Sequence, residues 1–106
     1  MTATSETPSA AVTPESDPVA AQLVALVRRR LADELDLPES RIRVVSVTPY
    51  TWTDSSLGCP NPDQQYVPVV IEGYRIEASA GERAYVFHTD SERLSPCEAG
   101  RERLPE

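Results

Sequence analysis

The chain has 106 residues, and its ten basic side chains, all arginine, face seventeen acidic ones for a formal net charge of −7. This length fits one domain, and an acidic chain without a basic cluster is a poor binder of nucleic acid or anionic lipid. No apolar stretch reaches the roughly 18 residues of a membrane span, and one histidine with two cysteines is too few for a zinc site of those residues alone. We therefore expect no nucleic-acid partner, no transmembrane segment, no metal and no cofactor.

Residues 1–17 are predicted to form a disordered tail or tether. Val12 is their only large aliphatic residue after Met1, so the segment cannot bury enough apolar surface to offset the entropy of ordering it. No basic region followed by an apolar run is present, so this chain shows no signal peptide. Two interpretations stay open, namely a natural cytoplasmic start at Met1 or a tether left after removal of an export signal.

Residues 18–104 are predicted to form one small domain that opens with a helix. The Asp17 side chain can accept from the free amides of a first turn, and Pro18 suits the first helical position. Apolar residues then recur three or four apart over residues 19–37, which indicates a helix with one apolar stripe. Pro38 disfavours helical geometry at the residue before it, so the helix is expected to end there.

The next segments are predicted to be a strand and a long loop. Residues 42–47 are rich in β-branched side chains, and the strand could extend to Trp52, although Pro49 favours an edge position or a bulge. Residues 53–68 are different in kind and contain Gly58, Pro60, Asn61, Pro62, Asp63 and Pro68. This composition is typical of a long ordered loop, and such loops are often functional.

Three further strands are predicted after the loop. In the second half of residues 69–80, apolar and polar side chains alternate, and Gly73 is expected to mark a bulge or bend. Gly81 and Glu82 join this strand to residues 83–89 as a hairpin, and residues 93–97 add a short last strand. The fold class is therefore α+β, with one helix packed on a twisted antiparallel sheet of about four strands.

Cys59 and Cys97 are the only cysteines, so they form one pair if they bond. By the chain-entropy model a bond closing this loop stabilises the domain by about 4 kcal/mol, and such bonds persist outside the cytosol. The alternatives are reduced or metal-linked thiols, or a reactive Cys59 with His88 as its base and Asp90 to orient the base. No cysteine-hydrolase signature surrounds Cys59, so we expect that the protein is not an enzyme.

Residues 52–62 read WTDSSLGCPNP. This segment resembles the W-x-D-x-S-L-G-C-P-x-P signature of small uncharacterised bacterial proteins, many of them exported or lipid-anchored. In those proteins an I-x-V-V-S-V strand precedes the signature, and G-Y-R-I, Y-x-x-H-T-D and a late cysteine follow it, as residues 42–47, 73–76, 85–90 and Cys97 do here. The resemblance implies the same fold, the disulfide and export, and it implies no activity.

Each candidate residue has a structural and a functional interpretation. Trp52 is either a core anchor whose indole N–H bonds a carbonyl or an exposed recognition aromatic, and Asp54 either caps a turn or serves a site. His88 with Asp90 and Glu92 could suggest a metal, but a solvated or hydrogen-bonded histidine is the simpler interpretation. The candidate binding residues are Trp52, Asp54, Leu57, Pro60, Asn61, Gln64, Gln65 and Tyr66.

These features favour a small extracytoplasmic binding module that presents the disulfide-anchored loop to another protein. A stiff loop loses little entropy on binding, and protease inhibition is one specific version of this function. The alternatives are a structural or accessory envelope domain without its own ligand and, further off, a cysteine-dependent enzyme. A cytoplasmic location remains the alternative to export, and the oligomeric state is left open.

Overall fold

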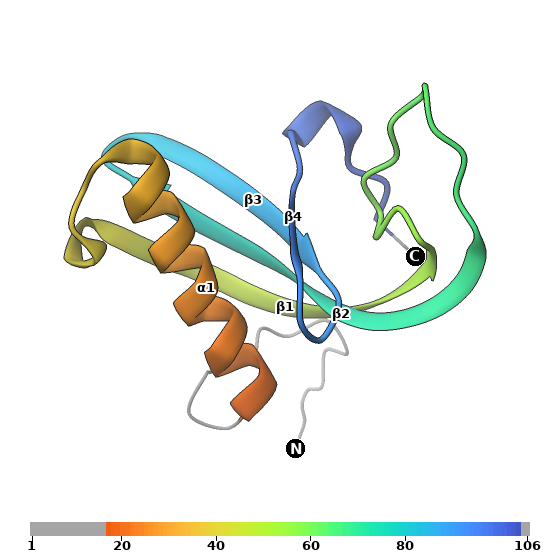
Figure 1. The fold of residues 1–106 in the computed structure, drawn as a ribbon, viewed down its shortest axis with the longest axis horizontal. Helices are drawn as coiled ribbons and strands as arrows, with labels where there is room; N and C mark the ends of the chain where they lie inside the picture. The colour runs from red at the N-terminus through yellow and green to blue at the C-terminus, as the bar shows by residue number, and fades with distance from the viewer. Residues whose placement is uncertain (1–16, 105–106) are drawn as a thin grey trace, which may run out of the picture.

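The computed structural model describes residues 17–104, so all of the predicted tail at residues 1–17 except Asp17 lies outside the described part (Figure 1). The elements in chain order are the helix α1 (Pro18–Leu35), the short helix η2 (Glu39–Arg41), the strands β1 (Ile42–Asp54), β2 (Pro68–Ala80), β3 (Arg83–Thr89) and β4 (Leu94–Pro96), and the short helix η3 (Ala99–Arg101). One helix therefore packs on a four-stranded antiparallel sheet, which confirms the predicted α+β class.

Helix α1 begins where the sequence predicts, and it ends at Leu35, two residues before the predicted end at Leu37. The Asp17 carboxylate accepts hydrogen bonds from the backbone N–H groups of Val19 and Ala20, at 3.0 and 3.1 Å. At the other end Asp36 adopts a left-handed conformation, with φ of 57°, and its N–H bonds the carbonyl of Ala32. This C-terminal cap stops the helix before the proline effect applies.

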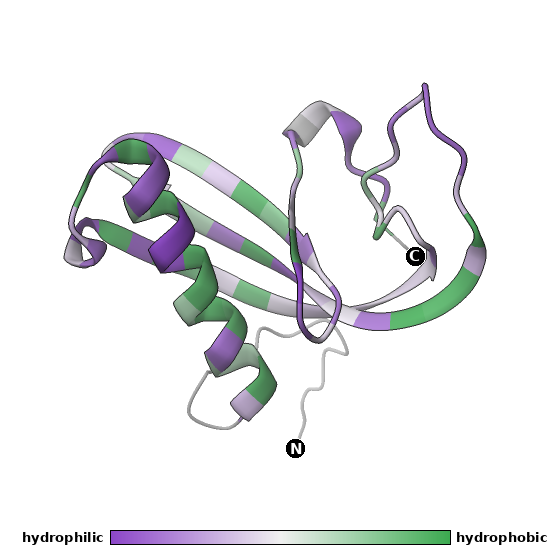
Figure 2. Ribbon diagram, in the orientation of Figure 1, coloured by the Kyte–Doolittle hydropathy of each residue, from purple (hydrophilic) through white to green (hydrophobic). Residues whose placement is uncertain are grey.

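The core lies between α1 and one face of the sheet. The alternating green and purple along α1 in Figure 2 reflect one apolar stripe that turns toward the strands. The buried members of this core are Ala20, Leu23, Val24, Val27, Leu31 and Ala32 from α1, and Ile42, Val47, Ile76, Ala78 and Phe87 from the sheet. A core of this size leaves little margin of stability, so a covalent tie has a large relative effect.

The strands follow the order β1-β2-β3-β4 along the sheet, so each hairpin joins neighbours. Strand β1 lies at an edge, as Pro49 predicts, and it runs on to Asp54 because β2 pairs with it along its length. The register shifts between Val44 and Ser46 and again between Trp52 and Asp54. Such irregularities increase the local twist. Because β3 pairs with β2 only over residues 74–80, the outer part of the β1–β2 ribbon continues beyond the rest of the sheet as two strands.

Gly73 was expected to mark a bulge or bend, and the strand register shows no bulge at this position. Pairing between β1 and β2 is regular through Gly73, which lies opposite Tyr50. The reason for glycine is close approach, because a Cβ atom there would lie 1.7 Å from the carbonyl oxygen of Thr89. Gly81, with φ of 64°, forms the predicted hairpin turn between β2 and β3.

Candidate functional site

The connection between β1 and β2, residues 55–67, is the loop singled out by its composition. A disulfide joins Cys59 of this loop to Cys97, with Cα atoms 5.9 Å apart, and no cysteine is free. The N–H of Cys97 donates to the carbonyl of Val86 at 2.8 Å, so the disulfide links the loop to strand β3. The predicted disulfide is confirmed, and the alternative of a reactive Cys59 thiol does not apply to the bonded form.

Trp52 was included among the binding residues, and the structure corrects this because its side chain is only 1% exposed. Its indole N–H donates to the carbonyl of Thr89 at 2.9 Å. The indole stacks between Tyr50 and His88, with ring centroids 5.2 and 4.7 Å away. Trp52 therefore lies at the centre of a second core, which it forms with Tyr50 and His88 on the sheet face away from α1. Its buried side chain cannot itself touch a partner.

The start of the loop packs directly on this indole. A Cβ atom at Gly58 would lie 2.4 Å from Cζ3 of Trp52, and Gly58 has φ of 75°. The residue before it, Leu57, also adopts a left-handed conformation, with φ of 56°. Such a conformation costs a non-glycine residue of order 1 kcal/mol or more, so it persists only where neighbouring contacts hold it.

His88 supplies that contact from strand β3. Its ring is fully buried, and Nδ1 lies 2.6 Å from the carbonyl oxygen of Leu57. Because a carbonyl oxygen can only accept, Nδ1 carries a hydrogen. On the other side of the ring, Nε2 lies 2.7 Å from a carboxylate oxygen of Glu102.

Glu102 is held as a carboxylate between two donors. Its oxygens lie 2.7 Å from Nε and 3.3 Å from Nη2 of Arg75. Burial alone would raise the pKa of Glu102, but hydrogen bonds from Arg75 and His88 outweigh it and hold the pKa below its ordinary value. Arg75 and His88 thus contact the same carboxylate oxygen of Glu102, and through it the C-terminal segment is joined to strands β2 and β3.

The segment that follows η3 closes over the start of the loop. The N–H of Arg103 donates to the carbonyl of Gly58 at 2.8 Å. Residues 57–59 are thus fixed by the disulfide, by His88 and by Arg103. Sequence reasoning missed Arg75, Glu102 and Arg103, because each stands among other charged residues and no spacing relates them to the loop.

The outer part of the loop is ordered by its own polar groups. The Asp54 carboxylate accepts from the backbone N–H of Ser56 at 2.8 Å, which is the turn cap considered for it, and also from the Ser56 hydroxyl. The N–H of Ser55 donates to the carbonyl of Val67 at 3.0 Å and closes the loop. The Tyr66 hydroxyl accepts from the N–H of Asn61 at 2.9 Å.

The candidate residues therefore divide by exposure. Gln64 and Gln65 are exposed at the tip of the loop, together with Pro62, Asp63 and Val67, which the sequence analysis did not include. Asp54, Leu57, Pro60, Asn61 and Tyr66 are partly buried and mainly hold the loop in shape. The face available to a partner is thus 62–65 with Val67, and we call it the loop tip.

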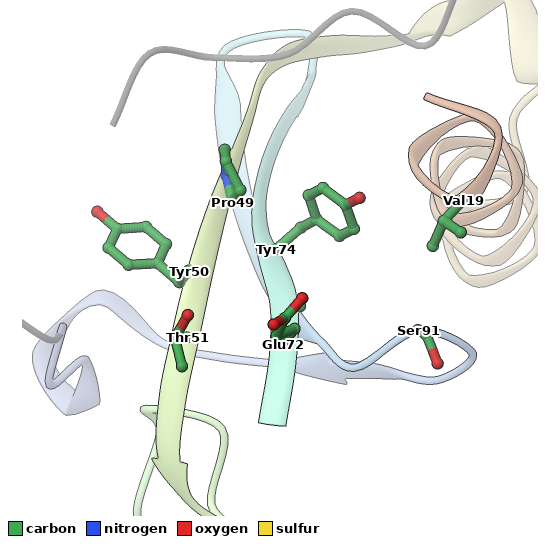
Figure 3. A pocket seen from close by; sticks show the side chains of 8 residues that line it. Val19, Pro49, Tyr50, Thr51, Glu72, Tyr74 and Ser91 are labelled. Atoms are coloured by element: carbon green, nitrogen blue, oxygen red, sulfur yellow. The ribbon is translucent and has the colours of Figure 1, made fainter. Parts of the chain in front are cut away.

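A hollow of about 390 Å³ lies on the other side of the ribbon, near the start of α1 (Figure 3). Tyr74 points across it toward Val19, whereas Tyr50 points away to the opposite side of β1. The Tyr74 hydroxyl donates to Asp17. Burial, that hydrogen bond and the nearby negative charges of Asp17 and Glu72 raise the pKa of Tyr74 to about 12. Tyr74 thus holds the carboxylate of Asp17, which caps the N-terminus of α1.

Two kinds of site, a metal centre and a membrane-spanning helix, can be considered for residues 17–104. No three histidine, cysteine, aspartate or glutamate side chains in this range converge on a metal position, and His88 does not meet Asp90 and Glu92. Within the same range, no helix is both long and apolar enough to span a bilayer.

Comparison with known proteins gives one family. The family model described as "Domain of unknown function (DUF8738)" matches residues 24–97, from the first turns of α1 to the second cysteine. Neither the curated proteins nor the solved structures contain a match to the chain.

Proposed function

Since the chain belongs to the DUF8738 family, whose description assigns no activity, we propose its function from the site itself: a small extracytoplasmic binding module that offers the loop tip to another protein. The observation that carries this proposal is the contrast within residues 55–67. One covalent bond and two carbonyl hydrogen bonds fix residues 57–59, while the side chains of the loop tip are exposed.

Preorganisation is the physical advantage of such a loop. A flexible loop would lose conformational freedom on binding, at an estimated cost of about 0.5–1.5 kcal/mol for each side chain ordered. Here the backbone conformation exists before the partner arrives. The disulfide also supports a location outside the cytosol, where such bonds persist. Two free thiols in protein isolated from its native cells without reductant would argue against this location.

A comparison of a loop variant with a control variant outside the loop tests the proposal. We expect the triple variant Gln64→Ala/Gln65→Ala/Val67→Ser to keep the fold and lose a protein that the unaltered chain captures from an extracytoplasmic fraction. Glu39→Ala, an exposed change on η2, should capture the same protein as before. Equal capture by all three chains would contradict a role for the loop tip.

Protease inhibition is the most specific form of the proposal, because a fixed loop can occupy a protease cleft without being cut rapidly. The assay is inhibition of a panel of secreted serine and cysteine proteases by the oxidised chain. Inhibition that the triple loop variant abolishes would support this form. Full activity of every protease at high inhibitor concentration would eliminate it and leave the general binding module.

A further inference from the structure

The outer edge of β3 is open beyond the end of β4. Strand β4 pairs with β3 only over residues 87–89, although β3 begins at Arg83. The disulfide accounts for this break, because the chain at Cys97 turns toward Cys59 and continues into η3. Within residues 17–104, no strand covers residues 83–86 on this side.

The direction of the free backbone groups follows from the pairing. The carbonyl of Val86 accepts from the N–H of Cys97, so the backbone groups of Val86 point away from β2. The register of β3 against β2 is regular, and alternate residues point their backbone groups to the same side. The N–H and C=O of Ala84 and the N–H of Val86 therefore point to the open edge, where no described residue bonds them.

A groove of about 530 Å³ runs along this edge. Figure 1 shows α1 on one side of β3 and the β4–η3 segment on the other. The groove is lined by Leu31, Glu34, Ala84, Tyr85, Val86, Phe87, Pro96, Cys97, Glu98 and Arg101. An extended chain laid against the edge would point every second side chain toward Tyr85, which is partly exposed.

We propose that this edge binds an extended segment of a protein partner, which adds to β3 as a further strand and places an apolar side chain in the groove. Free donors and an acceptor at strand spacing recognise an extended backbone, which a helix cannot provide because its backbone groups are already bonded. A second copy of this chain fits less well. The open edge of that copy would itself lie between its own α1 and its own β4–η3 segment, which would hinder the approach of two edges. Each copy also carries a net charge of −7, so two copies repel each other.

The experiment begins with a random peptide library displayed on phage and selected against the oxidised full-length protein. The strongest peptide is synthesised and titrated into the ¹⁵N-labelled protein. We expect selection of peptides rich in β-branched and apolar residues. The peptide should shift the amides of Ala84 and Val86 and slow their hydrogen exchange.

Variants at Ala84 then test the backbone contact. Ala84→Pro removes an outward N–H at an exposed edge position, where proline is tolerated, and should weaken binding by about tenfold or more. Ala84→Thr keeps the N–H and should bind as the unaltered chain does. The amide spectrum of each variant verifies its fold. If Ala84→Pro does not fold, slower hydrogen exchange of the Ala84 and Val86 amides in the unaltered protein with bound peptide tests the backbone contact instead.

Several results would overturn the proposal: no peptide selected, equal binding by Ala84→Pro, or shifts confined to other surfaces. A dimer in ultracentrifugation that Ala84→Pro dissociates would replace the partner segment with a second copy. The triple loop-tip variant should bind the peptide unchanged, so failure at this edge and failure at the loop tip are separate results.

Discussion

At the scale of single residues, His88 joins parts of the chain that are far apart in sequence. One ring touches the loop at Leu57, the C-terminal segment at Glu102 and the indole of Trp52. From sequence, hydrogen bonding was the simpler expectation for this histidine, and it is confirmed. Its partners were not predictable, because the pairing depends on how β3, the loop and the segment after η3 meet in space.

Gly73 gives a first prediction at this scale. Gly73→Ala should destabilise the fold by about 3 kcal/mol or more, because the added carbon would collide with the Thr89 carbonyl that binds the Trp52 indole. Thermal unfolding followed by Trp52 fluorescence measures this loss. Gly100→Ala, where the added carbon meets nothing within 4 Å, is the control. Equal unfolding temperatures for both variants would refute the close-approach explanation.

Glu102 gives a second prediction, which includes a dependence on pH. Glu102→Gln should lower the free energy of unfolding at pH 7 by about 2 kcal/mol, because charge-assisted hydrogen bonds to Arg75 and His88 are lost. The lowered pKa means that the carboxylate stabilises the fold above the ordinary value of 4.5 and loses this effect as pH falls through the folded value.

Urea unfolding at a series of pH values tests this. The difference between the unaltered chain and Glu102→Gln should shrink as the pH is lowered below 4.5. Glu82→Gln, an exposed change in the β2–β3 hairpin, should behave as the unaltered chain at every pH. A difference that stays constant into acid would show that Glu102 acts through packing alone.

At the scale of elements, features that depend on neighbours in the sequence were predictable, and features that depend on contacts between distant parts of the chain were not. The helix and the four strands follow from local periodicity, and the strand ends differ by a few residues where pairing extends them. Exposure in the loop was harder, because Trp52 and Gln65 look equally suited to recognition in sequence. Only the packing of the Gly58 backbone on the indole buries Trp52 and leaves Gln65 outside.

The disulfide is the element-scale test of loop order. The double variant Cys59→Ser/Cys97→Ser should lose about 4 kcal/mol of folding stability, following the chain-entropy model. It should also exchange the amides of residues 57–59 faster than those of β1 and β2. Hydrogen exchange with mass spectrometry measures both. Unchanged protection of residues 57–59 would mean that His88 and Arg103 hold the loop without the covalent bond.

At the scale of the molecule, the α+β architecture and the disulfide were accessible from sequence, whereas the second core was not. That core lies on the sheet face opposite α1, around Trp52 and His88, and the segment after η3 covers it. No period in the sequence marks it, because its members come from β1, β3, the loop and the C-terminal segment. The family match spans the two cysteines and most of both cores.

The distribution of carboxylates predicts how the whole fold responds to acid. A hydrogen bond from Tyr74 lowers the pKa of Asp17, while in Asp90 bonds from the Glu92 and Arg93 amides outweigh the opposing effect of burial. With Glu102, these groups stabilise the fold above their ordinary pKa values, so the free energy of unfolding should decrease steadily as pH falls below about 4. Stability that is constant down to strongly acidic pH in urea titrations would contradict this account.

The central claim is that residues 55–67 form a preorganised surface. Backbone ¹⁵N relaxation of the oxidised protein measures it directly. The account predicts order parameters of about 0.85 through the loop tip, equal to those of β1 and β2. Values below about 0.6 at residues 62–65, with rigid strands on either side, would show a flexible loop and contradict the claim.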